Sequence, residues 1–278
     1  MNTQSASLGK NRIHQIDAEV LATRRAGAYT VLTLSANQIA AAAKPGQFVT
    51  CSVGEVGTGL ILRRAFSIHD VTSTGGQGGT IDVVVAPHGG GTQWLAQRRR
   101  YDKVNVSGPL GQGFKVPREH VSCVLVGGGY GSAPLFFLAK VLAARGCRIE
   151  MILGGATADR VFGILESRRA ANSTTLVTED GTLGVTGRVT DVLVDSINRF
   201  DAKAIYACGP MGMLAAISEL AIDAEVACQV AVEEAMACGF GVCMTCVLPI
   251  KGDDKVPRLV RACVAGPVFA CEQVAWHL

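Results

Sequence analysis

The chain has 278 residues, of which 49% are apolar and 18% charged, and its formal net charge is +3. This composition is that of a globular protein, and the nearly balanced charge gives no indication of nucleic-acid binding. No apolar run reaches 18 residues and the first residues are polar, so we expect neither a membrane span nor a secretory signal. A cytoplasmic protein of two or three domains is the expectation.

An antiparallel β-barrel is predicted for residues 13–118, after a flexible tail at 1–12. Its evidence is a series of short runs with alternating apolar and polar residues, separated by glycine-rich turns. The clearest of these runs are 28–35, 46–53, 66–71 and 80–87. Short helices are expected at 35–43 and 92–99.

The pattern changes over residues 119–226, where apolar strands alternate with helices. This alternation predicts a parallel, doubly wound sheet, that is, a Rossmann-like α/β domain. Helices are expected at 132–146, 188–197 and 211–223. The last fifty residues carry five of the ten cysteines, and a third, small domain is expected at 227–278.

Two turns of the α/β region are candidate nucleotide-binding sites, because backbone amides at a strand-to-helix turn bind phosphate. The first turn contains Gly127, Gly128, Gly129 and Gly131. Its spacing departs from G-x-G-x-x-G, since the last glycine comes one residue early, and an ordinary structural turn is the alternative. The second turn contains Cys208, Gly209 and Pro210. There the alternative is a small buried thiol beside a turn.

The predicted barrel contains two candidate cofactor contacts. The first is the strand segment Arg64, Ala65, Phe66 and Ser67. Its arginine can neutralise a pyrophosphate, and its aromatic and hydroxyl groups can contact a flavin ring, although an ordinary strand with a surface arginine is the alternative. The second is the turn with Gly91 and Thr92, whose amides and hydroxyl suit another phosphate.

Cys238, Cys243 and Cys246 have the C-x4-C-x2-C spacing that is typical of plant-type [2Fe–2S] proteins. Such a cluster needs a fourth, more distant cysteine. We expect Cys263 to be this ligand and keep Cys271 as the alternative. A zinc site and a disulfide are the alternatives. Zinc sites usually contain two C-x2-C pairs, whereas this segment contains one, Cys243 and Cys246.

The order of these motifs resembles the ferredoxin-reductase flavoprotein superfamily over nearly the whole chain from about residue 13. The motifs are R-x-F-S, G-x-G-T-x-x-L, SGPLGQGF, GGGYGSAPL and CGPMGML. Any one of them is modest evidence, whereas five in the same order are specific. The resemblance implies that the barrel binds FAD and that the α/β domain binds NAD(P).

The C-terminal sequence EEAMACGFGVCMTC, followed by CVAGPVF, resembles more closely the electron-transfer subunit of class 1B dihydroorotate dehydrogenase. By this resemblance, the FAD contacts fall on Arg64, Ala65, Phe66, Ser67, Gly91 and Thr92, with Val84, Val85 and Ala86 adjacent. The chain departs from the family pattern at Ala65, where proline is usual. The loop between Cys246 and Cys263 is also slightly long.

The resemblance implies electron transfer in pyrimidine biosynthesis, between NAD+ and an FMN-containing dihydroorotate dehydrogenase catalytic subunit, through FAD and a [2Fe–2S] cluster. A heterotetramer with two of each subunit is expected. The five histidines are scattered, so no catalytic residue is expected in this chain. The alternatives are an electron-transfer subunit of a hydrogenase, sulfide dehydrogenase or bifurcating transhydrogenase, and a non-catalytic subunit with structural zinc.

Overall fold

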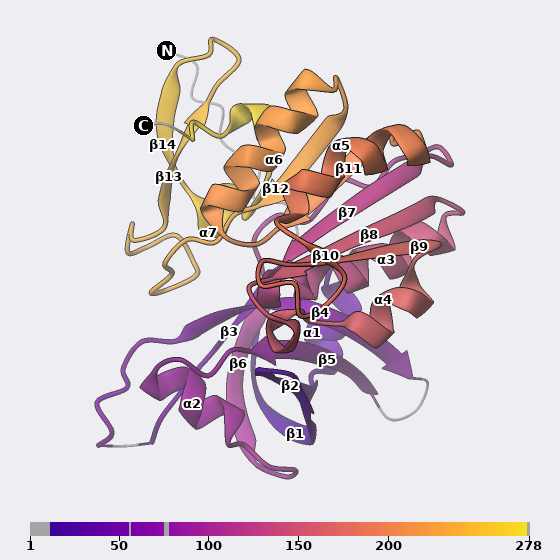
Figure 1. The fold of residues 1–278 in the computed structure, drawn as a ribbon. Coiled ribbons are helices and arrows are strands. Elements are labelled where there is room, and N and C mark those ends of the chain that lie inside the picture. Colours follow the sequence, from indigo (N-terminus) through magenta and orange to yellow (C-terminus); the bar gives the residue numbers. More distant parts are fainter. Residues whose placement is uncertain (1–11, 56, 75–77, 277–278) are drawn as a thin grey trace.

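The structure is a computed structural model that describes residues 12–55, 57–74 and 78–276. It consists of a closed antiparallel barrel, a mainly parallel sheet with helices on both faces, and a C-terminal hairpin beside that sheet (Figure 1). The predicted barrel and α/β classes are confirmed. Apart from Arg12, the expected tail lies outside the described residues. Among the residues described, no helix is both long and apolar enough to span a membrane.

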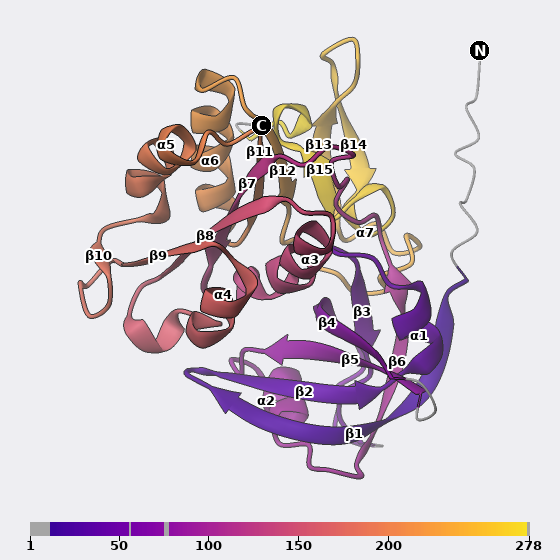
Figure 2. The ribbon, with the colours of Figure 1, turned by 90° about the vertical axis from the view of Figure 1, so that its right-hand side faces the viewer.

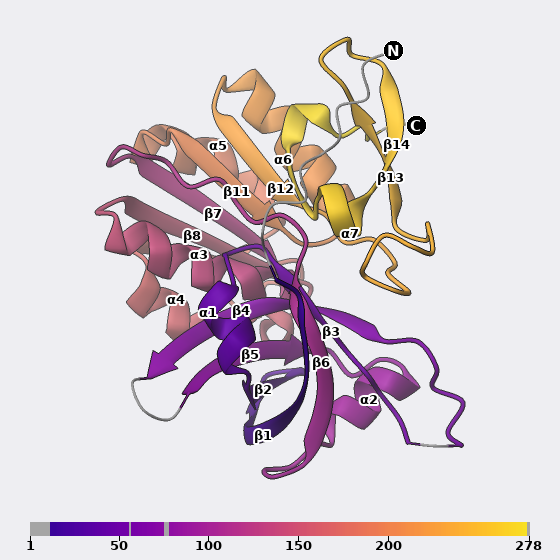
Figure 3. The ribbon, with the colours of Figure 1, turned by 180° about the vertical axis from the view of Figure 1, so that it is seen from behind.

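The barrel has six strands in the order β1-β2-β5-β4-β3-β6. Their bounds are β1 His14–Ala26, β2 Tyr29–Ser35, β3 Phe48–Cys51, β4 Arg64–Thr74, β5 Gly78–Val85 and β6 Lys103–Leu110. Helices α1 (Asn37–Ala42) and α2 (Gly90–Ala96) follow β2 and β5, and α1 packs against β5 (Figure 3). Leu32, Ile81 and Val83 are fully buried in the barrel, which explains the period-2 pattern of the sequence.

The second sheet has seven strands in the order β10-β9-β8-β7-β11-β12-β15, and only β15 runs antiparallel to its neighbour. The strands are β7 Ser122–Gly128, β8 Arg148–Gly155, β9 Ser173–Thr178, β10 Val185–Thr186, β11 Ala204–Cys208, β12 Ala227–Ala231 and β15 Val268–Ala270. Val124, Leu125 and Val126 of β7 are all fully buried, because helices cover both faces. This burial explains the continuous apolar run.

Two pairs of helices cover the two faces of this sheet (Figure 2). Helices α3 (Ala133–Ala144) and α4 (Ile164–Ala170) lie on the face toward the barrel, where α3 contacts β4. Helices α5 (Val189–Phe200) and α6 (Met211–Asp223) contact each other on the opposite face. Short 3₁₀ turns, η1 Gly129–Ser132 and η2 Ala158–Arg160, follow β7 and β8.

The C-terminal part consists of a two-stranded hairpin, two short helical segments and a cysteine-bearing loop. Its elements are β13 Val247–Lys251, β14 Pro257–Arg261, α7 Ala262–Ala265 and η3 Cys271–Gln273. Strands β12 and β15 lie beyond the domain boundary expected at 226/227, yet both pair within the nucleotide-domain sheet. The loop 232–246 runs from the end of β12 to the hairpin, and it packs on the barrel at Gly239 and on the end of β14 and α7 at Gly241.

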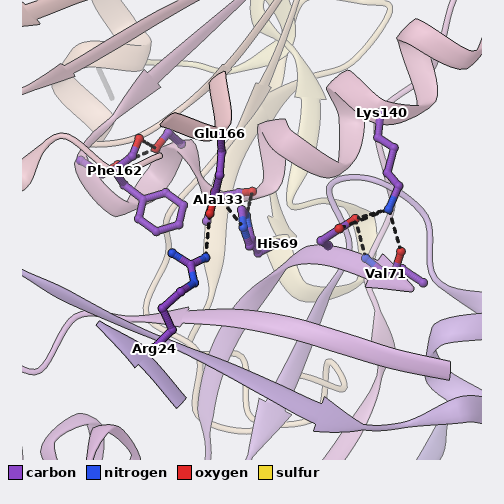
Figure 4. A network of polar contacts seen from close by, with 10 residues as sticks. Arg24, His69, Val71, Ala133, Lys140, Phe162 and Glu166 are labelled. Atoms are coloured by element: carbon purple, nitrogen blue, oxygen red, sulfur yellow. Dashed lines mark hydrogen bonds and ion pairs between the residues drawn. The ribbon is translucent and has the colours of Figure 1, made fainter. Parts of the chain in front are cut away.

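A polar clasp of Arg24, His69 and Glu166 joins the barrel to the helices of the second domain (Figure 4). His69 of β4 is buried, and its Nδ1 donates to the carbonyl oxygen of Ala133 at 2.8 Å. Its Nε2 lies 3.4 Å from one carboxylate oxygen of Glu166 in α4, and Arg24 of β1 donates to the other oxygen at 2.7 Å. The clasp fixes the barrel against α3 and α4, and so fixes the space between the domains.

The Glu166 carboxylate is expected to stabilise this interface at neutral pH. Hydrogen bonding from His69, with a further contribution from Arg24, lowers the pKa of Glu166 below its usual value. Its contribution is therefore complete above pH ~4.3 and is lost as the pH falls through the lowered pKa of the folded state. We expect Glu166→Gln to reduce stability by ~1 kcal/mol at pH 7. The difference in Tm from the wild type should shrink toward pH 4 and below; a constant difference would contradict this role.

Candidate electron-transfer site

A cavity of about 540 Å³ lies where the barrel, the second sheet and the cysteine-bearing loop meet; we call it the barrel cavity. The barrel lines it with Arg64, Ala65, Phe66, Ser67, Val84, Ala86 and Thr92. The other two parts of the chain line it with Gly131, Cys208, Ala237 and Thr245, among others. Its size and mostly apolar walls suit the ring system of an organic cofactor.

Arg64 has the chemistry of a pyrophosphate ligand, because no carboxylate neutralises it within the described residues. Its guanidinium donates to the carbonyl oxygens of Leu62 and Arg63, at 2.6 and 3.4 Å. The neighbouring Arg63 is instead held inside the barrel wall by Thr50 and Asn105. Arg64 is therefore free to bind an anion, whereas Arg63 is a structural residue.

Two predicted flavin contacts do not line the barrel cavity. Val85 is fully buried in the barrel, because side chains alternate along β5 between the core and the cavity. Gly91 lies against Arg64: a Cβ at Gly91 would come within 3.0 Å of the Arg64 Nε. The Thr92 hydroxyl accepts from the amides of His88 and Gly89, at 3.1 and 3.0 Å. These hydrogen bonds fix the loop before α2, and Thr92 also lines the barrel cavity.

A second cavity, of about 520 Å³, opens at the carboxyl ends of the parallel strands; we call it the sheet cavity. It is lined by Gly128, Gly129, Gly154, Gly155, Arg160, Glu179, Arg188 and Pro210, among others. This edge is where open α/β sheets bind nucleotides. A Cβ at Gly128 would lie 2.7 Å from the Met213 sulfur, so this glycine keeps the turn in its close packing with α6.

The other predicted residues of the two glycine-containing turns after β7 and β11 either line the barrel cavity or support the turns from below. Gly131 faces the barrel cavity, and its absent side chain lets the two turns touch, since a Cβ would lie 2.6 Å from the Cα of Gly209. Gly127 packs under Ser132 and lines neither cavity. Burial raises the pKa of the Cys208 thiol to about 12, so a neutral thiol faces the barrel cavity.

The four predicted ligand cysteines are brought together as two pairs. Cys238 lies close enough to Cys243 to help lower the pKa of that thiol, and the amide of Cys263 donates to the Cys246 sulfur at 3.5 Å. In the part of the chain that the structure describes, no three His, Cys, Asp or Glu side chains are placed to ligate one metal ion. Two pairs of thiols are the donor set that two irons of a [2Fe–2S] cluster require. Cys271 lies elsewhere, near the buried Cys228 of β12, whose side chain is the main cause of the lowered pKa of Cys271.

The loop that carries these cysteines is built around two glycines with positive φ. At Gly239, with φ +78°, a Cβ would lie 2.7 Å from the Thr50 side chain, so the loop packs closely on the barrel. The Arg261 guanidinium donates to the carbonyl oxygen of Gly241 at 2.6 Å, which fixes the other side of the loop. The amide of Phe240 points at the Cys238 sulfur at 3.3 Å. Such amide–sulfur contacts tune iron–sulfur clusters.

Known proteins with similar sequences identify the family. The family model for the iron–sulfur cluster binding domain of dihydroorotate dehydrogenase B matches residues 233–275. The dihydroorotate dehydrogenase B (NAD(+)) electron transfer subunit of Desulforamulus reducens is 35% identical over 262 residues, covering 94% of this chain and 98% of its own. The subunit of Geobacillus thermodenitrificans is 38% identical over 270 residues, covering 96% and 99%. This chain belongs to that family of electron transfer subunits.

Solved structures agree with this family and its fold. A chain of the NADH-dependent reduced ferredoxin–NADP oxidoreductase aligns with a TM-score of 0.81 and 27% identity, covering 94% of this electron transfer subunit and 90% of that chain. The ferredoxin reductase of carbazole 1,9a-dioxygenase aligns with a TM-score of 0.62 and 19% identity, over 77% and 67% of the two chains. The second likeness concerns the fold alone. The predicted membership of the ferredoxin-reductase superfamily is confirmed.

In this electron transfer subunit, Thr245 links the barrel cavity to the cysteines. It lines the cavity, and its hydroxyl donates to the Cys243 sulfur at 3.2 Å. Hydrogen bonds, first from the Thr245 side chain and also from Cys238, lower the pKa of Cys243 to about 6. One side chain therefore touches both the cavity and a predicted cluster ligand.

The sequence did not single out several residues that the structure places at the two cavities. Thr245 had no signal beyond its position beside Cys246. Arg160 ends the 3₁₀ turn η2 and Arg188 immediately precedes α5, at the carboxyl edge of the sheet, and neither was assigned a role. Tyr130 and Glu233 stood inside motifs but were assigned no role, because their contact joins residues far apart in the chain.

Proposed function

We propose that this subunit transfers electrons between NAD+ and an FMN-containing dihydroorotate dehydrogenase catalytic subunit in pyrimidine biosynthesis, as a heterotetramer with two of each chain. One observation carries the proposal: Thr245 lines the barrel cavity and donates to the sulfur of Cys243. A cavity fit for a flavin and a set of four thiols are thereby direct neighbours. When bound, FAD exchanges a hydride with NAD(H) and single electrons with a [2Fe–2S] cluster, so its place is between them.

The barrel residues are assigned to FAD by their chemistry. Arg64 supplies an uncompensated positive charge for the pyrophosphate. Ala65, Phe66 and Ser67 lie on the same strand and face the barrel cavity. The backbone at Val84, Val85 and Ala86, and the turn with Gly91 and Thr92, complete the proposed site.

The sheet cavity is assigned to NAD(H). Gly128, Gly129 and Pro210 line it from the two turns, with Gly127, Gly131, Cys208 and Gly209 supporting these turns or facing the barrel cavity. Arg160 and Arg188 add two positive charges at the same edge, which suits a dinucleotide pyrophosphate. A ligand bound at the open carboxyl edge of the sheet would lie beside the barrel cavity, which supports this assignment.

The four paired thiols of Cys238, Cys243, Cys246 and Cys263 are assigned to the [2Fe–2S] cluster. The loop around them presents apolar side chains to solvent: Phe240, Val242 and Met244 are 40%, 82% and 54% exposed. An exposed apolar group around a redox site suits a docking face for the catalytic subunit. A cytoplasmic location is also proposed, because clustered thiols hold metal rather than form disulfides in a reducing compartment.

The proposal is tested by reconstituting the full chain anaerobically and mixing it with a dihydroorotate dehydrogenase catalytic subunit. We expect about one FAD and about two irons per chain, co-elution of the two proteins, and NAD+ reduction by dihydroorotate that needs both. Four irons per chain, or zinc in their place, would contradict the cluster assignment. A stable complex that does not reduce NAD+ would contradict the proposed reaction.

A second candidate function keeps the same cofactors but serves another catalytic partner. The likeness to the NADH-dependent reduced ferredoxin–NADP oxidoreductase chain, at a TM-score of 0.81 over 94% of this subunit, favours it. The distinction lies in the partner rather than in this chain. Purification of the tagged subunit from its native host decides between the two, by the identity of the flavoprotein that co-purifies.

A further inference from the structure

Two side chains form the common wall of the barrel cavity and the sheet cavity. Of the described residues that line either cavity, only Tyr130 and Glu233 line both. The Tyr130 hydroxyl donates to the Glu233 carboxylate, which joins the turn after β7 to the segment after β12. The pair therefore stands between the two spaces that the proposed function assigns to NAD(H) and FAD.

The backbone on either side of Tyr130 is held in place, so its side chain is the part that can move. A Cβ at Gly131 would lie 2.6 Å from the Cα of Gly209, which shows how closely the two turns pack. The Tyr130 ring contacts the Tyr29 ring edge-on, with centroids 6.0 Å apart, and is itself 37% exposed. Burial, and then Glu233, raise the Tyr130 pKa above its usual value, so the phenol is a donor at neutral pH.

Hydride transfer requires the nicotinamide and the flavin to come into contact, so the side chains between the two cavities must let the nicotinamide ring pass. The reacting carbon of the nicotinamide and the reacting nitrogen of the flavin must approach to about 3–3.5 Å. With the adenosine diphosphate part of the dinucleotide in the sheet cavity, the nicotinamide ring has to reach the barrel cavity. The boundary between the cavities is the Tyr130–Glu233 pair.

We propose that Tyr130 and Glu233 form a latch that closes the passage between the sheet cavity and the barrel cavity and that opens when the nicotinamide ring of NAD(H) enters. This inference rests on the proposed function, because it takes the two cavities as the NAD(H) and FAD sites. Tyr130 acts as a positioning residue that sets the fraction of molecules in which the nicotinamide ring can enter the barrel cavity. Ligands without a nicotinamide ring fill the sheet cavity with the latch closed.

The test compares NAD+ with ADP-ribose, which lacks the nicotinamide ring, as ligands of the FAD-loaded full chain. Tyr130→Phe keeps the ring contact with Tyr29 but removes the hydrogen bond to Glu233. If only a fraction of the protein is open, the apparent Kd for NAD+ is the intrinsic Kd divided by that fraction. Tyr130→Phe should increase the open fraction, so we expect this variant to bind NAD+ about tenfold more tightly. Its Kd for ADP-ribose should stay unchanged. Both constants are measured by isothermal titration calorimetry.

Glu233→Gln is the second variant, because it keeps a hydrogen-bond acceptor of the same shape but removes the charge. We expect a change in the same direction and of smaller size for NAD+, and none for ADP-ribose. Equal shifts for the two ligands, or an unchanged Kd for NAD+ in both variants, would overturn the latch while leaving the cofactor assignments intact. Failure of the wild type to bind ADP-ribose would instead overturn the nucleotide site, and the latch with it.

Discussion

Replacing Cys243 by serine is expected to reduce the iron content from about two atoms per chain to almost none. Cys243 pairs with Cys238, so its loss leaves one iron with a single thiolate. Serine has nearly the same volume, and Cys243 is exposed, so the fold should be unaffected. FAD content should also be unchanged, because Cys243 does not line the barrel cavity. Iron is measured by chelation assay, and FAD by its absorbance after release.

Cys271→Ser is the matched control for this prediction. Cys271 belongs to the same C-terminal part of the chain, but its side chain interacts with Cys228 and with none of the four predicted ligands. This variant should keep its iron. Full iron content in Cys243→Ser, or loss of iron in Cys271→Ser alone, would show that the ligand set is different.

The second large effect is expected from Arg199→Met, which leaves a charge unpaired inside the nucleotide domain. Glu150, near the start of β8, is fully buried, and its Oε1 accepts from Arg199 and from the Thr175 hydroxyl. Loss of one partner of a buried pair costs about 3–5 kcal/mol. We expect about 2–3 kcal/mol here, because the Arg199 side chain is 62% exposed and water replaces part of the interaction.

The double variant Glu150→Leu/Arg199→Met separates the cost of the unpaired charge from the value of the ion pair. If the loss in Arg199→Met comes from a stranded carboxylate, removing that carboxylate should restore most of the stability. Chemical denaturation of the full chain measures three variants: Arg199→Met, Glu150→Leu and the double variant. A double variant that is as unstable as the sum of the single variants would contradict this explanation.

Local patterns in the sequence predicted the class and order of the parts. Alternation at period 2 marked the barrel strands, and the apolar run at β7 marked a strand covered on both faces, as its full burial confirms. The expected helix at 211–223 coincides with α6, because a tight turn at Pro210 begins it. The strands β12 and β15, which follow the expected boundary at 226/227, look like separate short strands in the sequence, and only the sheet pairs them with the nucleotide domain.

The sequence by itself determined that this chain has a barrel, a nucleotide-type sheet and a C-x4-C-x2-C cysteine loop, because periodicity and spacing are local properties. The tertiary structure decided which groups meet. It paired Cys246 with Cys263, placed Thr245 between the barrel cavity and Cys243, and brought Tyr130 to Glu233 across 103 residues. Such contacts depend on how turns at one sheet edge pack against a barrel, and no pattern within a single segment encodes that packing.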